Sequence, residues 1–235
     1  MNPNDLAFGF LEYVVFLLST TCHEASHALV AKWGGDPTAF EHGQVSLNPV
    51  PHIRREPFGM VVMPLLGILS NTGLIGWASA PYDPRWSMAH PRRAAWMSLA
   101  GPGANFSLCA IAAIVMRVGL ALGFFMPGAI STSQIVMAQA GSGIADGVAT
   151  ITSVFFSLNL LLGCFNLLPF PPLDGYGVLG LFTDDRGAAK LQAFRMRMGM
   201  FSFIGLLVAW RLLSSLYVPM LTAGIRVVYF GYRMG

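Results

Sequence analysis

Residues 6–33 read LAFGFLEYVVFLLSTTCHEASHALVAKW, and this stretch decides the fold class. It is apolar through Leu18 and turns polar from Ser19, and the helix-stopping sequence GGDP follows at 34–37. A membrane-spanning helix needs roughly 20 mostly apolar residues. The stretch therefore predicts a spanning helix that carries polar residues toward its C-terminal end.

The composition extends this prediction to the whole chain. Of the 235 residues, 54% are hydrophobic and 11% are charged, whereas an ordinary soluble domain has about 25% charged residues. This composition predicts an integral multi-pass protein of the lipid bilayer and excludes a disordered chain or a typical cytosolic enzyme. The net charge is only +3 and the basic residues are scattered, so we expect no nucleic-acid partner.

Three more stretches have the length and apolar character of spans: 94–125, 148–168 and 198–217. Residues 219–232 predict either a tilted last span or an interfacial helix. Residues 58–77 contain Pro64 and several glycines, so they predict either a span or a segment that folds back. We expect a mainly α polytopic helix bundle of about four to five spans with a small membrane-embedded β or re-entrant region, and residues 45–47 could supply one strand.

We expect one integral-membrane domain over residues 1–235, with a core at about 6–182 and C-terminal helices within 198–232. Three loops contain Lys or Arg, which places them on the inner side, and one loop has neither, which places it outside. The inner loops are 34–57, 78–93 and 183–197, and the outer loop is 126–147. Because 34–57 and 78–93 share a side, the segment 58–77 is predicted not to cross the membrane.

The chemistry is concentrated in His23-Glu24-Ala25-Ser26-His27, an HExxH motif. On an α-helix, residues four apart point only about 40° away from each other, so both imidazoles face one way. Two neutral imidazoles suit Zn²⁺, and the glutamate between them can act as the general base on a zinc-activated water. The motif predicts one zinc ion per chain. The alternative is a polar patch inside the bundle.

A catalytic zinc site usually has a third protein ligand. Asp174 directly follows the predicted span 148–168 and a proline-rich run, although an Asp-Gly pair is equally typical of an ordinary turn. If 58–77 does not cross, Asp174 and the HExxH motif lie at the same end of the bundle. Other candidates lie in polar loops: His42, His52, His90, Glu41 and Glu56.

With these features together, the sequence resembles the site-2 protease family of intramembrane zinc metalloproteases, in its short bacterial form without PDZ or CBS domains. The resemblance covers about residues 10–180. It is carried by HEASH at 23–27, QVSLNPVPHI at 44–53, the segment from Phe58 to Pro64, GWASAP at 76–81, AGPGAN at 100–105 and NLLPFPPLDG at 166–175. Ser79 and Tyr176 depart from residues that are common in the family.

The resemblance implies that zinc is held by His23, His27 and Asp174, with Glu24 as the catalytic base. It implies a single-span membrane protein as substrate, cut within or near the bilayer, and it suggests the plasma membrane of a prokaryote. It favours Asn105 as a contact for the substrate or the oxyanion, with a hydrogen bond between helices as the alternative. For Asn166 the same two roles are open, and the hydrogen bond between helices is favoured.

A helical substrate must unwind before cleavage, and an edge strand at 43–47 or 58–64 could capture the extended form. Two other functions stay open at this point: a membrane metal transporter and a non-proteolytic scaffold. One metal-like cluster, without a second row of intramembrane carboxylates, argues against transport. The complete set of proposed site residues argues against a scaffold.

Overall fold

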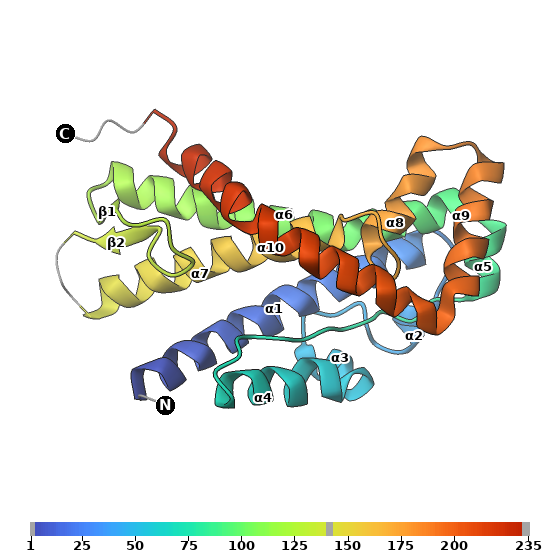
Figure 1. The fold of residues 1–235 in the computed structure, drawn as a ribbon, viewed down its shortest axis with the longest axis horizontal. Coiled ribbons are helices and arrows are strands. Elements are labelled where there is room, and N and C mark those ends of the chain that lie inside the picture. Colours follow the sequence, from blue (N-terminus) through green and yellow to red (C-terminus); the bar gives the residue numbers. More distant parts are fainter. Residues whose placement is uncertain (1–2, 140–142, 232–235) are drawn as a thin grey trace.

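In the computed structural model, which describes residues 3–139 and 143–231, four helices are long and apolar enough to cross a membrane. They are α1 (Pro3–Trp33), α6 (Pro91–Ala121), α7 (Gly143–Asn166) and α10 (Ser202–Tyr229). The prediction of a mainly α polytopic bundle is confirmed, with four spans (Figure 1).

The prediction of separate C-terminal helices is wrong. Helix α10 continues through Pro219 to Tyr229, so the segment from 219 onward is its last part rather than a helix of its own. Residue 232, the expected end of that segment, lies outside the described residues. A membrane helix tolerates an internal proline where its neighbours compensate for the lost backbone bond.

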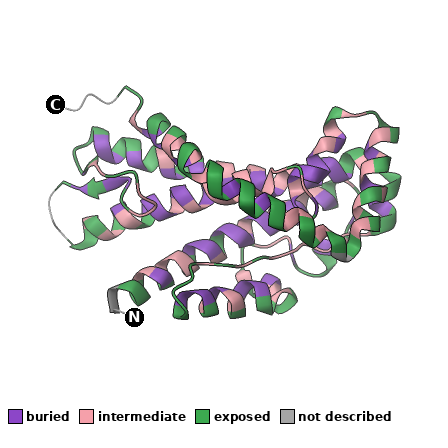
Figure 2. Cartoon of the chain, in the orientation of Figure 1, coloured by how far each residue is buried: buried purple, intermediate pink, exposed green. Residues whose placement is uncertain are grey.

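Helix α6 is the centre of the bundle, because it packs along both α1 and α7, while α10 crosses over α6 and α7 (Figure 1). The main hydrophobic core includes Met116 of α6, Phe156 of α7 and Leu221 of α10. The outward faces of the spans carry large exposed apolar side chains, most plainly along α10 (Figure 2). Such surfaces suit lipid, since soluble proteins rarely expose apolar patches of this extent.

The two ends of the bundle differ. One end is built from α2 (Thr38–Glu41), α3 (Pro49–Arg55), α5 (Pro84–Ala89), α8 (Asp174–Val178), the 3₁₀ turn η2 (Leu179–Phe182), α9 (Asp185–Met198) and the 3₁₀ turn η3 (Gly199–Phe201). The other end holds β1 (Phe125–Pro127) and β2 (Val136–Ala138), paired antiparallel with Met126 opposite Met137 (Figure 1). The three basic loops thus contribute to the first end, and the side of the membrane that this end faces stays a prediction.

The strand expected at 45–47 does not form, and the small sheet lies instead in the predicted outer loop. Local side-chain bonds explain the difference. The Asn48 side chain accepts a bond from the Val50 amide and caps α3, and the His52 ring nitrogen Nε2 lies 3.0 Å from the Ser46 carbonyl. These bonds fold the segment into a loop, and capping overrides a short alternation of apolar residues.

Residues 58–77 fold back on themselves. A π-helical turn, η1 (Phe58–Val62), leads into α4 (Met63–Leu69), and the chain then returns in an extended conformation. The Trp77 amide donates to the Gly59 carbonyl at 3.1 Å. A Cβ atom at Gly59 would lie 2.2 Å from the Trp77 carbonyl oxygen, so only glycine allows the two arms to meet. The helical arm of roughly 18 Å is too short to span the membrane.

This helical conformation at 58–64, together with the loop at 43–47, means that neither predicted edge strand forms. The extended part of this region is residues 73–83, which follow α4.

Candidate metal centre

The HExxH motif lies on α1, where it faces α6 and α8. The Nε2 atoms of His23 and His27 are 2.9 Å apart. Asp174 Oδ2, at the start of α8, lies 3.0 Å from His23 Nε2 and 3.2 Å from His27 Nε2. The structure thus brings together three potential ligand atoms from segments 151 residues apart in sequence.

Hydrogen bonds on the far side of each ring define the tautomers. His23 Nδ1 lies 2.6 Å from Asn105 Oδ1, and His27 Nδ1 lies 2.7 Å from the Met97 carbonyl oxygen. Both partners can only accept, so each Nδ1 carries the proton and donates it. Each Nε2 therefore directs a lone pair at the other and at a carboxylate oxygen. Such a triangle of acceptors requires a cation at its centre, either a metal ion or added protons.

The donor set fits a zinc ion. Ligand atoms of tetrahedral zinc are about 3.3 Å apart for bonds of about 2.0–2.1 Å, and the three observed separations are 2.9, 3.0 and 3.2 Å. Glu24 is buried beside them, and its Oε2 atom has no hydrogen-bond partner. Its carboxylate also lies within 4.8 Å of the nearest ring nitrogens, which makes it an alternative third ligand. The shorter contacts to Asp174 favour Asp174 over Glu24 as the third ligand.

Helix α6 approaches the triangle so closely that a side chain cannot fit. A Cβ atom at Gly101 would lie 2.3 Å from His27 Nε2 and 2.4 Å from His23 Nε2. The backbone of α6 at Gly101 therefore forms one wall of the centre. Two residues along the same helix, Gly103 has open space where its Cβ would be.

Asn105 is held by a chain of hydrogen bonds across three helices. Its Nδ2 donates to Asn159 Oδ1, and Asn159 Nδ2 donates to Ser19 Oγ and to the Phe155 carbonyl. Because that carbonyl can only accept, the order of donors fixes the Asn105 oxygen toward His23. Asn105 is fully buried and both ends of its amide have partners. This arrangement orients His23, and the predicted contact with substrate stays a prediction.

Asp174 is placed by a sharp turn after α7. A Cβ atom at Gly175 would lie 2.1 Å from the Leu167 carbonyl oxygen, so the chain can pass there only as glycine. Burial would raise the pKa of the Asp174 carboxyl, but the His27 and His23 imidazoles, when they carry the added protons, outweigh it and hold that pKa below its usual value. An ionised carboxylate is the form that ligates a metal.

Comparison with known sequences decides the family. The sequence profile of peptidase family M50 matches residues 11–208, a range that holds every proposed donor. The chain belongs to peptidase family M50, the site-2 protease family. Its membership confirms the predictions of that family and of a metallopeptidase. The chain therefore has a metal cofactor, and its four apolar helices make it a multi-pass membrane protein.

Named relatives agree with the M50 assignment. The chain is 33% identical over 214 residues to "Putative zinc metalloprotease YwhC" of Bacillus subtilis (strain 168), which covers 90% of this chain and 85% of that protein. It is 33% identical over 166 residues to "Putative zinc metalloprotease Rip2" of Mycolicibacterium smegmatis, covering 70% of this chain and 54% of that protein. The chain thus spans about half the length of that relative. No solved structure matches the chain significantly.

Other residues considered for this M50 site have different partners. His42 Nδ1 lies 2.7 Å from the Thr38 carbonyl, and Glu56 accepts a bond from Ser79 Oγ at 2.5 Å. Asn166 donates to the Leu162 carbonyl of its own helix, and among the described residues its side chain has no other hydrogen bond. Among the candidate ligands of the described chain, only Asp174 forms an ion-pair contact with both motif histidines.

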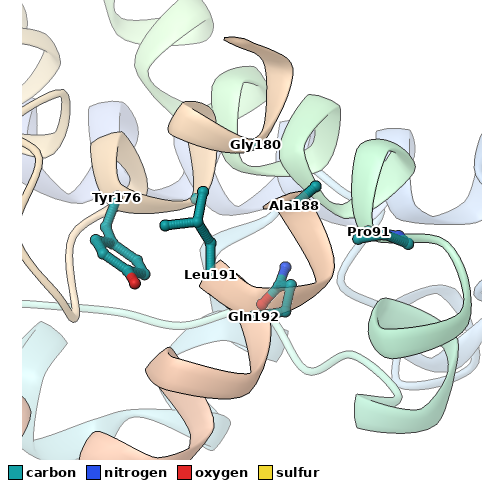
Figure 3. A pocket seen from close by; sticks show the side chains of 7 residues that line it. Pro91, Tyr176, Gly180, Ala188, Leu191 and Gln192 are labelled. Carbon is teal, nitrogen blue, oxygen red and sulfur yellow. The ribbon is translucent and has the colours of Figure 1, made fainter. Parts of the chain in front are cut away.

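Tyr176, one of the departures from the family pattern, packs against α9. Its ring packs 6.0 Å from that of Phe194 on α9. Figure 3 shows Tyr176 beside Leu191 and Gln192 in a hollow between α8 and α9, which has no room for a water-sized sphere. We interpret this hollow as packing that supports α8, and not as a ligand site.

Two contributors to the site lay outside the sequence predictions: the Met97 carbonyl and Gly101 as a wall. Met97, Gly101 and Asn105 recur every four residues, so they share one face of α6. This spacing is the signal that could have indicated the face of α6 that meets the motif.

Proposed function

We propose that the chain is a zinc-dependent endopeptidase that cleaves single-span membrane proteins within or near the bilayer, in the plasma membrane of a prokaryote. One observation carries the proposal. The acceptor triangle of His23, His27 and Asp174 lies beside a buried glutamate oxygen without a partner, on helices of membrane-spanning length. A carboxylate and two imidazoles inside a membrane bundle are costly unless they serve a function.

Each residue of the centre has a role in this proposal. One zinc ion would be held by His23 Nε2, His27 Nε2 and Asp174 Oδ2, and when bound it supplies Lewis-acid chemistry and lowers the pKa of a water toward about 7. Glu24 takes the proton from the attacking water and passes it to the nitrogen of the leaving amine. The Met97 carbonyl and Asn105 keep both imidazoles aimed at the centre.

The extended residues 73–83 are the best candidate for binding an unwound substrate. A Cβ at Gly76 would lie 2.4 Å from the Phe16 ring, and the Asp83 amide donates to Asp36 Oδ2 at 2.8 Å. The segment therefore runs beside the part of α1 that carries the motif (Figure 1). Within the described chain, the Trp77–Gly59 bond is the only backbone–backbone hydrogen bond of residues 74–82. The Ser79 carbonyl accepts from Arg55 Nε at 2.9 Å, and the other amides and carbonyls can pair with a strand.

The proposal is tested by cleavage in a membrane. Purified protein is reconstituted into liposomes with a single-span reporter, and the products are identified by mass spectrometry. We expect one main cut within or next to the apolar segment of the reporter, lost on treatment with a zinc chelator and restored by added zinc. Zinc-loaded protein that leaves a panel of such reporters intact would favour the scaffold or transporter.

A further inference from the structure

Glu12 is a second carboxylate inside the membrane span of α1, and the site described above does not use it. It lies in the apolar part of the helix and is half-buried. In the described part of the chain, no hydrogen bond or ion pair is formed by its side chain. Intramembrane carboxylates are costly, usually paired, and typical of functional positions.

The lipid-facing side of α1 is marked by four exposed apolar residues at helical spacing. They are Leu6, Phe10, Val14 and Leu18, each between 41% and 56% exposed. Glu12 is two residues from both Phe10 and Val14, which places it about 160–200° around the helix from them. Glu12 therefore points away from the lipid.

The face that Glu12 occupies is the face of the metal centre. Eleven residues separate Glu12 from His23, which corresponds to about three whole turns with an offset of only about 20°. Ser19, on the same face, meets Asn159 of α7. Glu12 thus lies in line with His23, about 16 Å further along α1.

Among the described residues, the surroundings of Glu12 offer no positive charge. The phenol of Tyr217 on α10 is close enough to interact electrostatically with the Glu12 carboxylate, but it is neutral or negative and never cationic. Burial desolvates the Glu12 carboxylate, and among the described residues no Lys, Arg or His acts on it. A cationic partner for Glu12 is therefore absent among the described residues, and another molecule that reaches this face could supply one.

We propose that Glu12 determines substrate specificity by pairing with a Lys or Arg inside the transmembrane segment of the substrate. This inference rests on the proposed proteolytic function. The 16 Å offset sets the position of that basic residue: about 11 residues from the cleaved bond if the intervening substrate is helical, and about 5 if it is extended. In a medium of low dielectric constant, such a pair relieves the desolvation of both charges.

The test compares reporters that differ at one position. A single-span reporter carries Lys or Leu at successive positions 5 to 11 residues from the cleavage site, and kcat/KM is measured in liposomes. We expect wild-type protein to prefer the best Lys reporter over its Leu counterpart at least tenfold, mainly through KM, and Glu12→Gln to lose that preference. Val14→Gln, which places the same amide on the lipid-facing side, should keep it.

Reversing the charge at position 12 gives a test that a folding defect cannot mimic, because it predicts a gain of activity on one reporter. Glu12→Lys should cleave an Asp reporter better than a Lys reporter, reversing the wild-type order. Equal use of Lys and Leu reporters by wild type, or an equal loss on both in Glu12→Gln without reversal in Glu12→Lys, overturns this inference while the cleavage itself upholds the proposed function. If zinc-loaded wild type cleaves no reporter, the proposed function fails and this inference fails with it.

Discussion

Replacing Gly101 by alanine is expected to lower zinc affinity at least 100-fold and to abolish peptidase activity. The added methyl group would lie 2.3 and 2.4 Å from the two imidazole nitrogens that would bind the metal, so α6 or both rings must shift. Ligand geometry tolerates little displacement, and changes that only reorient metal ligands already cost about 10–100-fold in affinity. Zinc content after equilibrium dialysis and reporter cleavage measure the effect.

Gly103→Ala is the matched control for that prediction. It makes the same substitution in the same helix, at a position with open space for the methyl group. Both variants gain the helix propensity of alanine, about 1 kcal/mol over glycine, so a difference between them reports on the metal centre. Zinc binding that is equal in the two variants would contradict the close approach of α6 to His23 and His27.

Glu24→Gln is expected to retain about one zinc per chain and to lose cleavage by a factor of about 10²–10⁴, the usual contribution of a general base. Glutamine keeps the shape of the side chain but cannot take up the proton of the attacking water. The variant also separates the two possible third ligands, because the Glu24 carboxylate lies within 4.8 Å of the ring nitrogens. Loss of zinc would make Glu24 a ligand, and cleavage within tenfold of wild type would remove it as the base.

Much of this fold could be predicted because membrane spans depend on local composition. The stretch 6–33 and the three further apolar segments each became one long helix. The same local reasoning failed at 45–47, where Asn48 and His52 fold the chain into a loop. It also divided α10 at Pro219, because the sequence does not show how neighbouring helices accommodate a proline.

The pairing of Asp174 with the HExxH motif was predicted from crossing parity and family resemblance, and the structure places these residues within 3.2 Å. The supporting atoms could not be predicted in the same way. The Met97 carbonyl has no sequence signature, because every residue has a carbonyl, and the importance of Gly101 depends on how closely two helices approach. Tertiary packing decides both.

The central claim is that α1 and α8, distant in sequence, build one zinc site. It is tested most directly by the zinc content per chain of detergent-purified protein, with Asp174→Ala compared against wild type and against Asp185→Ala, an exposed aspartate in the first turn of α9. We predict close to one zinc in wild type and Asp185→Ala, and a clear loss in Asp174→Ala. Full zinc retention in Asp174→Ala would contradict the account.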